Sequence, residues 1–356
     1  MLAKKVQGAG GVGGAAQGAT VAFVGSFNAT TPSIVSIDIS DPTNLAILDT
    51  ETMVSSSRVH QVLVDAGNDV LYALGQKVLA SYDISNPSAI TLLDSVSFTS
   101  NTGGFVLDTN RQLAFVTEYF TLHCFDISDP TNITSTDTIA LTLEARAAES
   151  RPGIDTTNDL LFVPQGNNTA ISVYDVSNSA SLALKATKTD STNLTRPTAV
   201  VADETINTIF VCGYDSFPTP NFLVTYSYNT STGVLTFLDS FSGTMGSGGL
   251  GLDLDLSNDV VYRPSLFADE IATVDVSNTS SMSQLDVFVD STNLDAIRDV
   301  RIDPVSNYAY GIGQATVSGT NYGRFSSVDA SDTTNLSTVD TVQSTAMATP
   351  YSIALR

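Results

Sequence analysis

The sequence predicts an all-β fold, a seven-bladed β-propeller with four strands in each blade. Along the 356 residues, a strand that ends in a tight turn recurs seven times, and a strand–turn–strand motif recurs six times. Successive copies of the first motif lie 43 to 54 residues apart. A repeat of this length that contains only short strands is typical of propeller blades. We expect a flexible Gly-rich tail at residues 1–18 and one propeller domain at residues 19–356.

The first motif is an alternating apolar strand that ends in Asp, as in IVSIDISDP at 34–42. Side-chain oxygens of Asp accept hydrogen bonds from backbone amides two residues on, and so stabilise turns. We therefore interpret the recurring aspartates as turn caps rather than as a calcium array. Ser227 replaces Asp in the fifth copy, and the aspartates of the other copies are Asp38, Asp83, Asp126, Asp175, Asp275 and Asp329.

The second motif supplies the first two strands of a blade. In VLVDAGNDVLYAL at 62–74, two apolar runs flank a polar turn that favours a tight hairpin. We assign these runs to strands A and B, the first motif to strand C, and a following segment such as AITLLDSV at 89–96 to strand D. Strands A and B are expected to be nearly all apolar because they are the inner strands of the blade.

The two ends of the chain contain the two halves of one further hairpin. YSIALR at 351–356 has the pattern of a strand A with no strand B after it, and TVAFVG at 20–25 has the pattern of a strand B with no strand A before it. We expect ring closure by pairing of this C-terminal strand A with the N-terminal strands B, C and D. Such closure removes exposed sheet edges.

Composition argues against two classes of partner. The formal net charge is −22, from 37 acidic and 15 basic residues, and such a field repels nucleic acid and anionic lipid. No stretch of the chain approaches 18 uninterrupted apolar residues. We therefore expect no nucleic-acid partner and no membrane insertion. The N-terminus also lacks the continuous apolar segment of a signal peptide.

No familiar constellation of catalytic or metal-binding residues is visible. The two histidines, His60 and His123, have no companion ligand nearby in sequence. The two cysteines, Cys124 and Cys212, lie inside apparent strands and are expected to be buried free thiols. On these grounds we predict that the protein is not an enzyme, with no catalytic residue, no metal site and no cofactor.

One face of the propeller is a candidate binding face. In a propeller, the D-to-A connections and the B-to-C loops share one face, and variable loops on a rigid scaffold commonly carry binding residues. Arginines recur before strand A, where they form either a positive mouth or ion pairs with acidic neighbours. The longest B-to-C loops are predicted at 214–222, 263–270 and 313–324. The candidate residues are Arg58, Tyr119, Arg151, Arg196, Tyr214, Phe217, Phe267, Arg298 and Tyr322.

The D-[IV]-S-[DN]-P signature resembles that of the LVIVD-repeat propellers, over roughly residues 19–356. It departs from that signature where Asp is lost, at 226–229, and where Pro is lost in the fourth, sixth and seventh copies. The resemblance implies a bacterial surface or secreted protein. The N-terminal KKVQGAGGVGG is similar to the start of some tailed-phage virion proteins from marine viruses.

These patterns leave three functions open. The first is a non-enzymatic virion attachment protein, anchored to a phage tail or capsid through residues 1–18, with Lys4, Lys5, Val6 and Gln7 as the anchor. Its partners would be other virion or surface-assembly proteins, in a symmetric homo-oligomeric assembly, and a host receptor or glycan on the loop face. The second is a binding propeller that is extracellular or at the bacterial cell surface. The third is a propeller enzyme whose active site is assembled from scattered loops.

Overall fold

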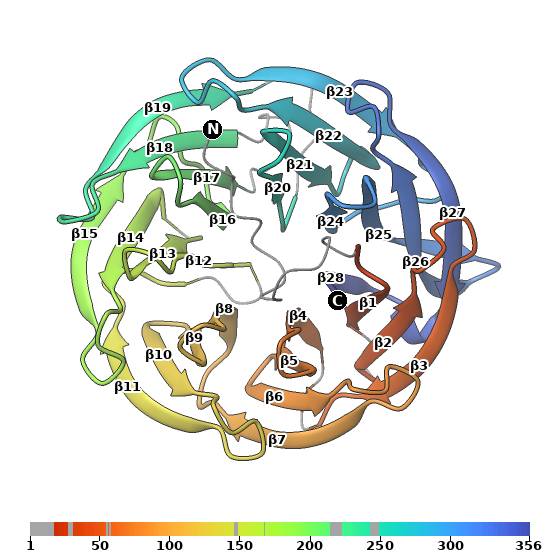
Figure 1. The fold of residues 1–356 in the computed structure, drawn as a ribbon, viewed down its shortest axis with the longest axis horizontal. Coiled ribbons are helices and arrows are strands. Elements are labelled where there is room, and N and C mark those ends of the chain that lie inside the picture. The colour runs from red at the N-terminus through yellow and green to blue at the C-terminus, as the bar shows by residue number, and fades with distance from the viewer. Residues whose placement is uncertain are drawn as a thin grey trace.

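The protein is a ring of seven four-stranded antiparallel sheets around a central axis (Figure 1), so the predicted seven-bladed β-propeller is confirmed. The computed structural model describes residues 18–27, 31–54, 56, 58–145, 149–166, 168–213, 223–242 and 249–356. Blade 1 is the sheet β28-β1-β2-β3, and blades 2 to 7 follow in chain order from β4 to β27. A single 3-10 turn among the described residues, Thr345–Met347, precedes β28.

The inner two strands of each blade lie closest to the axis (Figure 1). Strands A, in blade order, are β28 (Pro350–Leu355), β4 (Val59–Asp65), β8 (Thr102–Asp108), β12 (Gly153–Asp155), β16 (Pro197–Asp203), β20 (Asp253–Asp255) and β24 (Asp299–Asp303). Strands B are β1 (Val21–Ser26), β5 (Val70–Gly75), β9 (Leu113–Glu118), β13 (Leu160–Gln165), β17 (Thr208–Gly213), β21 (Val260–Ser265) and β25 (Tyr308–Val317).

The outer two strands complete each blade and differ sharply in burial. Strands C, which are mostly buried, are β2 (Ser33–Asp38), β6 (Val78–Asp83), β10 (Thr121–Asp126), β14 (Ala170–Asp175), β18 (Leu223–Tyr228), β22 (Glu270–Asp275) and β26 (Thr320–Asp329). Strands D, which form the solvent-facing rim, are β3 (Ala46–Thr52), β7 (Thr91–Ser97), β11 (Thr134–Ala140), β15 (Ala183–Thr189), β19 (Leu235–Phe241), β23 (Ser283–Val289) and β27 (Ser337–Ser344).

Blade 1 contains strands from both ends of the chain. β28 pairs antiparallel with β1, with Ala22 opposite Leu355 and Val24 opposite Ile353. Two further amides, those of Thr20 and Val21, donate to the carbonyl of Arg356 at 2.8 and 3.0 Å. Ala22, Val24 and Ile353 are fully buried, so the first and last strands of the domain share one core.

The recurring aspartates at the end of strand C cap their own turns. The Asp38 carboxylate accepts hydrogen bonds from the amide of Ser40 at 2.9 Å and from its hydroxyl at 2.6 Å. The equivalent bonds lower the pKa of Asp83, whose main partner is Ser85. The interpretation of these residues as turn caps is confirmed. The same amide bond is made by Asp126, Asp175, Asp275 and Asp329.

A second set of aspartates, which the sequence analysis did not single out, joins neighbouring blades. In strand D of blade 2, the Asp94 carboxylate accepts the amide of Ile133, in the C–D turn of blade 3, at 2.7 Å. Ala186 stands at the equivalent position of blade 4, so that blade lacks the bond. The six pairs are Asp49 with Ile90, Asp94 with Ile133, Asp137 with Leu182, Asp239 with Met282, Asp286 with Leu336, and Asp340 with Leu45.

The substitution Asp94→Ala tests this junction. It leaves the amide of Ile133, a residue with 6% exposure, without its acceptor. We expect a loss of about 1–3 kcal/mol in the free energy of unfolding, measured by urea denaturation. The matched control is Asp83→Ala, which removes a solvent-exposed turn cap and should cost less because water replaces the lost acceptor. Equal losses in the two variants would contradict a special role for the blade junction.

Candidate functional site

The inner edge of strand A carries backbone N–H and C=O groups that need hydrogen-bond partners. Strand A pairs with strand B on one side, and its other edge faces the axis, where unpaired backbone groups cost free energy if buried. Side chains of neighbouring strands A satisfy this edge. Gln61 donates to the carbonyl of Phe105 and accepts its amide, both at 2.9 Å. Likewise, the amide of Val62 donates to the hydroxyl of Ser352 at 3.2 Å.

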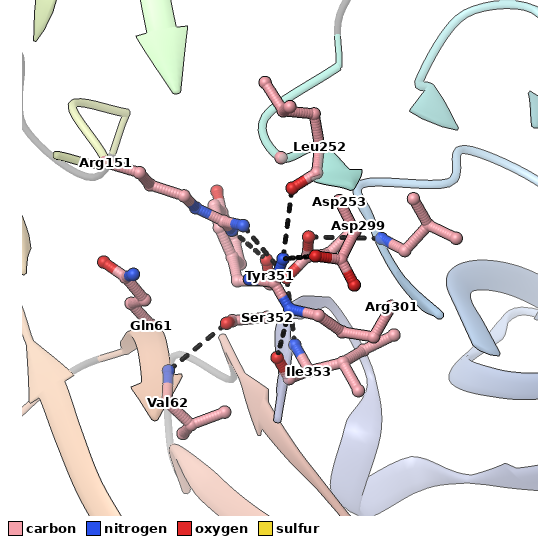
Figure 2. A network of polar contacts seen from close by, with 12 residues as sticks. Gln61, Val62, Arg151, Leu252, Asp253, Asp299, Arg301, Tyr351, Ser352 and Ile353 are labelled. Atoms are coloured by element: carbon pink, nitrogen blue, oxygen red, sulfur yellow. Dashed lines mark hydrogen bonds and ion pairs between the residues drawn. The ribbon is translucent and has the colours of Figure 1, made fainter. Parts of the chain in front are cut away.

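Charged side chains of blade 7 bond to the closing strand β28 (Figure 2). The buried carboxylate of Asp299 accepts the amide of Ile353 at 3.0 Å. Arg301 donates to the carbonyl of Ile353 at 3.1 Å and to that of Leu252 at 3.2 Å. These bonds tie blade 7 to blade 1 on one side and to blade 6 on the other.

Arg151 extends this network across the axis (Figure 2). It precedes strand A of blade 4, yet its guanidinium lies 2.9 Å from the Asp299 carboxylate of blade 7 and donates to the carbonyl of Tyr351 in blade 1 at 2.6 Å. Its exposure is 4%. A Cβ atom at Gly251 would lie 2.1 Å from an oxygen of Asp299 and 2.7 Å from Arg151 NH1. Glycine is therefore required there for the ion pair to form.

The ion pairs stabilise the charged forms of side chains that burial alone would destabilise. Burial acts to lower the pKa of Arg301, but the Asp299 and Asp253 carboxylates outweigh it and raise that pKa. Burial raises the pKa of Asp253, against the opposing effect of Arg301. Because a buried charge that loses its partner is strongly destabilising, each member of the network fixes the others.

His60 lies beside this network in a cationic environment. It is 1% exposed, and its ring is 6.5 Å from that of Tyr351. The Arg298 guanidinium lies 5.0 Å from the Tyr351 ring centroid. Burial, followed by the charges of Arg58 and Arg151, lowers the pKa of His60 to about 3. The imidazole is therefore neutral at pH 7, with one nitrogen a donor and the other an acceptor.

We call Arg58, His60, Arg151, Arg298 and Tyr351 the axial arginine site. Arg58, Arg298 and Tyr351 are partly exposed, whereas His60 and Arg151 are buried behind them. Neither ring nitrogen of His60 makes a hydrogen bond, and the Nε atoms of Arg58 and Arg151 are likewise buried without a hydrogen-bond partner. Since buried polar groups are nearly always hydrogen-bonded, these open groups are ones that a bound ligand or water would satisfy.

The structure brings together three of the four arginines predicted for the binding face. Arg58, Arg151 and Arg298 belong to the axial arginine site, although Arg151 is buried and ion-paired rather than part of an exposed mouth. Arg196 instead lies 3.9 Å from Glu149, as expected for an arginine paired with an acidic neighbour.

The predicted aromatic residues lie on separate hairpins. Tyr119 is in the two-residue turn between β9 and β10 and is 40% exposed, and Phe267 is in the turn between β21 and β22 and is 59% exposed. The predicted loop at 313–324 is wrong, because β25 and β26 extend through it and pair Ala315 with Tyr322. Tyr214 and Phe217 lie outside the described residues, as does the predicted anchor Lys4, Lys5, Val6 and Gln7.

The remaining histidine and the two cysteines have structural roles. His123 shares a hydrogen bond of 2.8 Å with Glu118. Cys124 and Cys212 are buried and free, which confirms that prediction. In the described part of the chain, no group of three or more His, Cys, Asp or Glu residues is placed to hold a metal ion. No helix in those same residues has the length and apolar character needed to cross a membrane.

The sequence analysis missed the charged residues of the network. It expected strand A to be nearly all apolar, which is wrong for blades 6 and 7, where Asp253, Asp299 and Arg301 occupy or begin the strand. The signal was present in the sequence. DVRID at 299–303 carries charges in positions where strand A of blade 5, PTAVVAD, carries small or apolar residues.

Comparison with known proteins confirms the fold and the repeat. The LVIVD repeat model matches residues 73–97, within blade 2. No curated protein sequence matches the chain. A crystal structure of a protein from Lactobacillus plantarum is similar with a TM-score of 0.75 at 17% identity, over 95% of this chain and 99% of that one. The predicted resemblance to LVIVD-repeat propellers is therefore confirmed.

Two further similar structures bear on the chemistry. A putative 6-phosphogluconolactonase from Bacteroides uniformis has a TM-score of 0.77 at 11% identity, over 96% of this chain and 100% of that one. The periplasmic gluconolactonase of Pseudomonas aeruginosa has a TM-score of 0.71 at 11% identity, over 94% and 98% of the chains. These identities establish a shared fold only.

The lactonase neighbours overturn the prediction that the protein is not an enzyme. That prediction rested on the lack of a recognisable motif, but propellers with the same fold are described as lactonases. In a propeller, the loops at one end of the axis come from distant parts of the chain, so an active site built there leaves no contiguous signature in the sequence.

The low pKa of His60 predicts a stability that falls in acid. The unfolded chain binds a proton near the ordinary pKa of 6.5, whereas the folded protein binds it only near 3, so protonation favours unfolding as the pH drops between these values. We expect His60→Gln to flatten the decline in unfolding free energy by up to about 1.4 kcal/mol per pH unit. Urea denaturation of both proteins at pH 7 and pH 4.5 measures it. Parallel declines would contradict the prediction.

Proposed function

We propose that the axial arginine site binds a small anionic molecule. The observation that carries the proposal is the placement of three guanidinium groups around Tyr351. Arg298 lies over its ring and Arg151 donates to its carbonyl, while Arg58 lies over Phe27, whose ring centroid is 6.4 Å from that of Tyr351. Guanidinium groups bind carboxylates and phosphates through paired, charge-assisted hydrogen bonds. The partly exposed Arg58 and Arg298 provide the outer contacts of such a ligand, and the buried Arg151 provides an inner one.

The charge of the whole protein supports this assignment. With a net charge of −22, the chain as a whole repels anions, so a concentration of positive charge beside the axis stands out against its surroundings. Asp299 pairs with Arg151, whereas the Arg58 guanidinium lies over the uncharged ring of Phe27, 5.0 Å from its centroid. Neutral His60 adds hydrogen-bonding capacity to the site without adding charge.

Titration with sodium sulfate at constant ionic strength tests the proposal by calorimetry. We expect one binding site per chain, weakened at least tenfold by Arg58→Ala, because a single charge-assisted contact is worth that much. The control is Arg111→Ala, which removes an arginine paired with Asp108 and Asp159 on the opposite face. No saturable sulfate binding, or equal weakening by both substitutions, would contradict the assignment.

A second candidate function is the hydrolysis of a lactone at the same site. His60 favours it, because a neutral imidazole with both nitrogens open can accept a proton from an attacking water. A guanidinium beside the carbonyl oxygen would stabilise the negative charge that develops on it. An anionic substrate would also offset the charges of Arg58 and Arg151, which hold the pKa of His60 low. Lactones are the first substrates to test because similar structures are described as lactonases.

Lactone hydrolysis is tested with glucono-δ-lactone and its 6-phosphate, followed by proton release. We expect turnover above the spontaneous rate, and a fall of at least a hundredfold in His60→Gln, in keeping with the usual contribution of a general base. His123→Gln is the matched control, because that histidine is paired with Glu118 away from the site. Rates equal to the uncatalysed reaction in the unaltered protein would exclude this candidate.

The other predicted roles remain proposals. None of the neighbours named above is described as a virion protein. The backbone amide of Ala19 donates to the Asp303 carboxylate at the A–B turn of blade 7, so residue 19 lies on the face opposite the axial arginine site. Attachment to a virion or a cell surface through residues 1–18 would leave the axial arginine site facing away from the assembly. The binding propeller of the LVIVD type agrees with the repeat match.

A further inference from the structure

The axial arginine site has polar groups without partners that include both hydrogen-bond donors and an acceptor. A ligand that satisfies all of them must therefore both accept and donate hydrogen bonds. The Nε atoms of Arg58 and Arg151 are donors, and they require an acceptor such as an anionic oxygen. His60 differs from both, because a neutral imidazole always presents one nitrogen that accepts. Both of its nitrogens are buried without a hydrogen-bond partner.

A bare anion would satisfy only part of this site. Sulfate or an unsubstituted carboxylate accepts hydrogen bonds and donates none at neutral pH, so it would leave the accepting nitrogen of His60 unsatisfied. An unsatisfied buried acceptor costs about 1–3 kcal/mol, which is enough to discriminate between ligands. A ligand that carries a hydroxyl group next to its anionic group satisfies the arginines and the imidazole together.

The surroundings of His60 leave this role to a ligand. The groups around it are Arg58 and Arg151, which both donate, and the ring of Tyr351, 6.5 Å away, which is covered by Arg298. The nearest carboxylate of the network, Asp299, is already bonded to Arg151 and to the amide of Ile353. Neither arginine hydrogen-bonds to His60, so the accepting nitrogen of its ring is open to a donor from a ligand.

We propose that the ligand of the axial arginine site is a hydroxy acid, with a hydroxyl group that donates to His60 and an anionic group held by Arg58 and Arg151. The inference rests on the proposed anion-binding function and narrows it. It predicts that the site distinguishes ligands by their hydroxyl groups as well as by their charge. His60 would recognise the hydroxyl group, and the arginines would recognise the anionic group.

Three probes separate these properties by calorimetry. Gluconate carries both a carboxylate and hydroxyl groups, hexanoate has the same number of carbons and the charge without hydroxyls, and sorbitol has hydroxyls without charge. We expect gluconate to bind at least tenfold more tightly than either of the others. In His60→Phe, which keeps a ring and loses both nitrogens, gluconate affinity should fall to that of hexanoate, while hexanoate affinity stays unchanged.

Two further variants keep the test decisive. His60→Gln retains an acceptor and should keep part of the preference for gluconate, which also covers the case in which His60→Phe does not fold. His123→Gln should leave every affinity unchanged. Equal affinities for gluconate and hexanoate, or a preference that survives in His60→Phe, would overturn the inference while leaving the anion site intact. If neither sulfate nor any carboxylate binds, the proposed function fails as well.

Discussion

The inner edge of strand A is the constraint on which the rest of this propeller depends. Each strand A turns one backbone edge toward the axis. Other backbone groups bond only part of these edges, as where Arg151 bonds Thr198 and Val200 of blade 5, and the remaining groups need other partners. The protein resolves this with side chains that bond from one strand A to the next, from Gln61 to Phe105 and from Ser352 to Val62. At the closing strand β28, the ion-paired side chains of Asp299 and Arg301 take the place of such uncharged side chains.

The transaxial ion pair of Arg151 and Asp299 links ring closure to the candidate site. The guanidinium of Arg151 holds Asp299 and the carbonyl of Tyr351, and its Nε is buried without a hydrogen-bond partner. A buried ion pair seldom adds net stability, but removing one partner costs several kcal/mol. The arrangement therefore fixes the position of Arg151 firmly, and a binding site gains specificity when its groups are held before the ligand arrives.

The fold could be predicted from the sequence more completely than the candidate site could, for physical reasons. Blade count and strand order follow from a repeat in which local turn chemistry, such as the Asp38 cap, recurs in each copy. The three arginines of the site precede strand A in blades 2, 4 and 7, whereas His60 and Tyr351 lie within strands A of blades 2 and 1. No spacing rule connects these residues. Arg58 and Arg298 could be suggested from their shared position, whereas the pairing of Arg151 with Asp299 depends on geometry across the axis.

The two faces of the ring differ in charge for reasons rooted in the repeat. Except in blade 5, where Asn229 caps the turn, each C–D turn is capped by at least one carboxylate. Hydrogen bonds to these carboxylates favour the ionised form, as the lowered pKa values of Asp126 and Asp129 indicate. That face is consequently negative in nearly every blade. The arginines precede strand A and so lie at the opposite end of the axis. The anion proposed for the axial arginine site would therefore enter from the end of the axis that lies away from these capped turns.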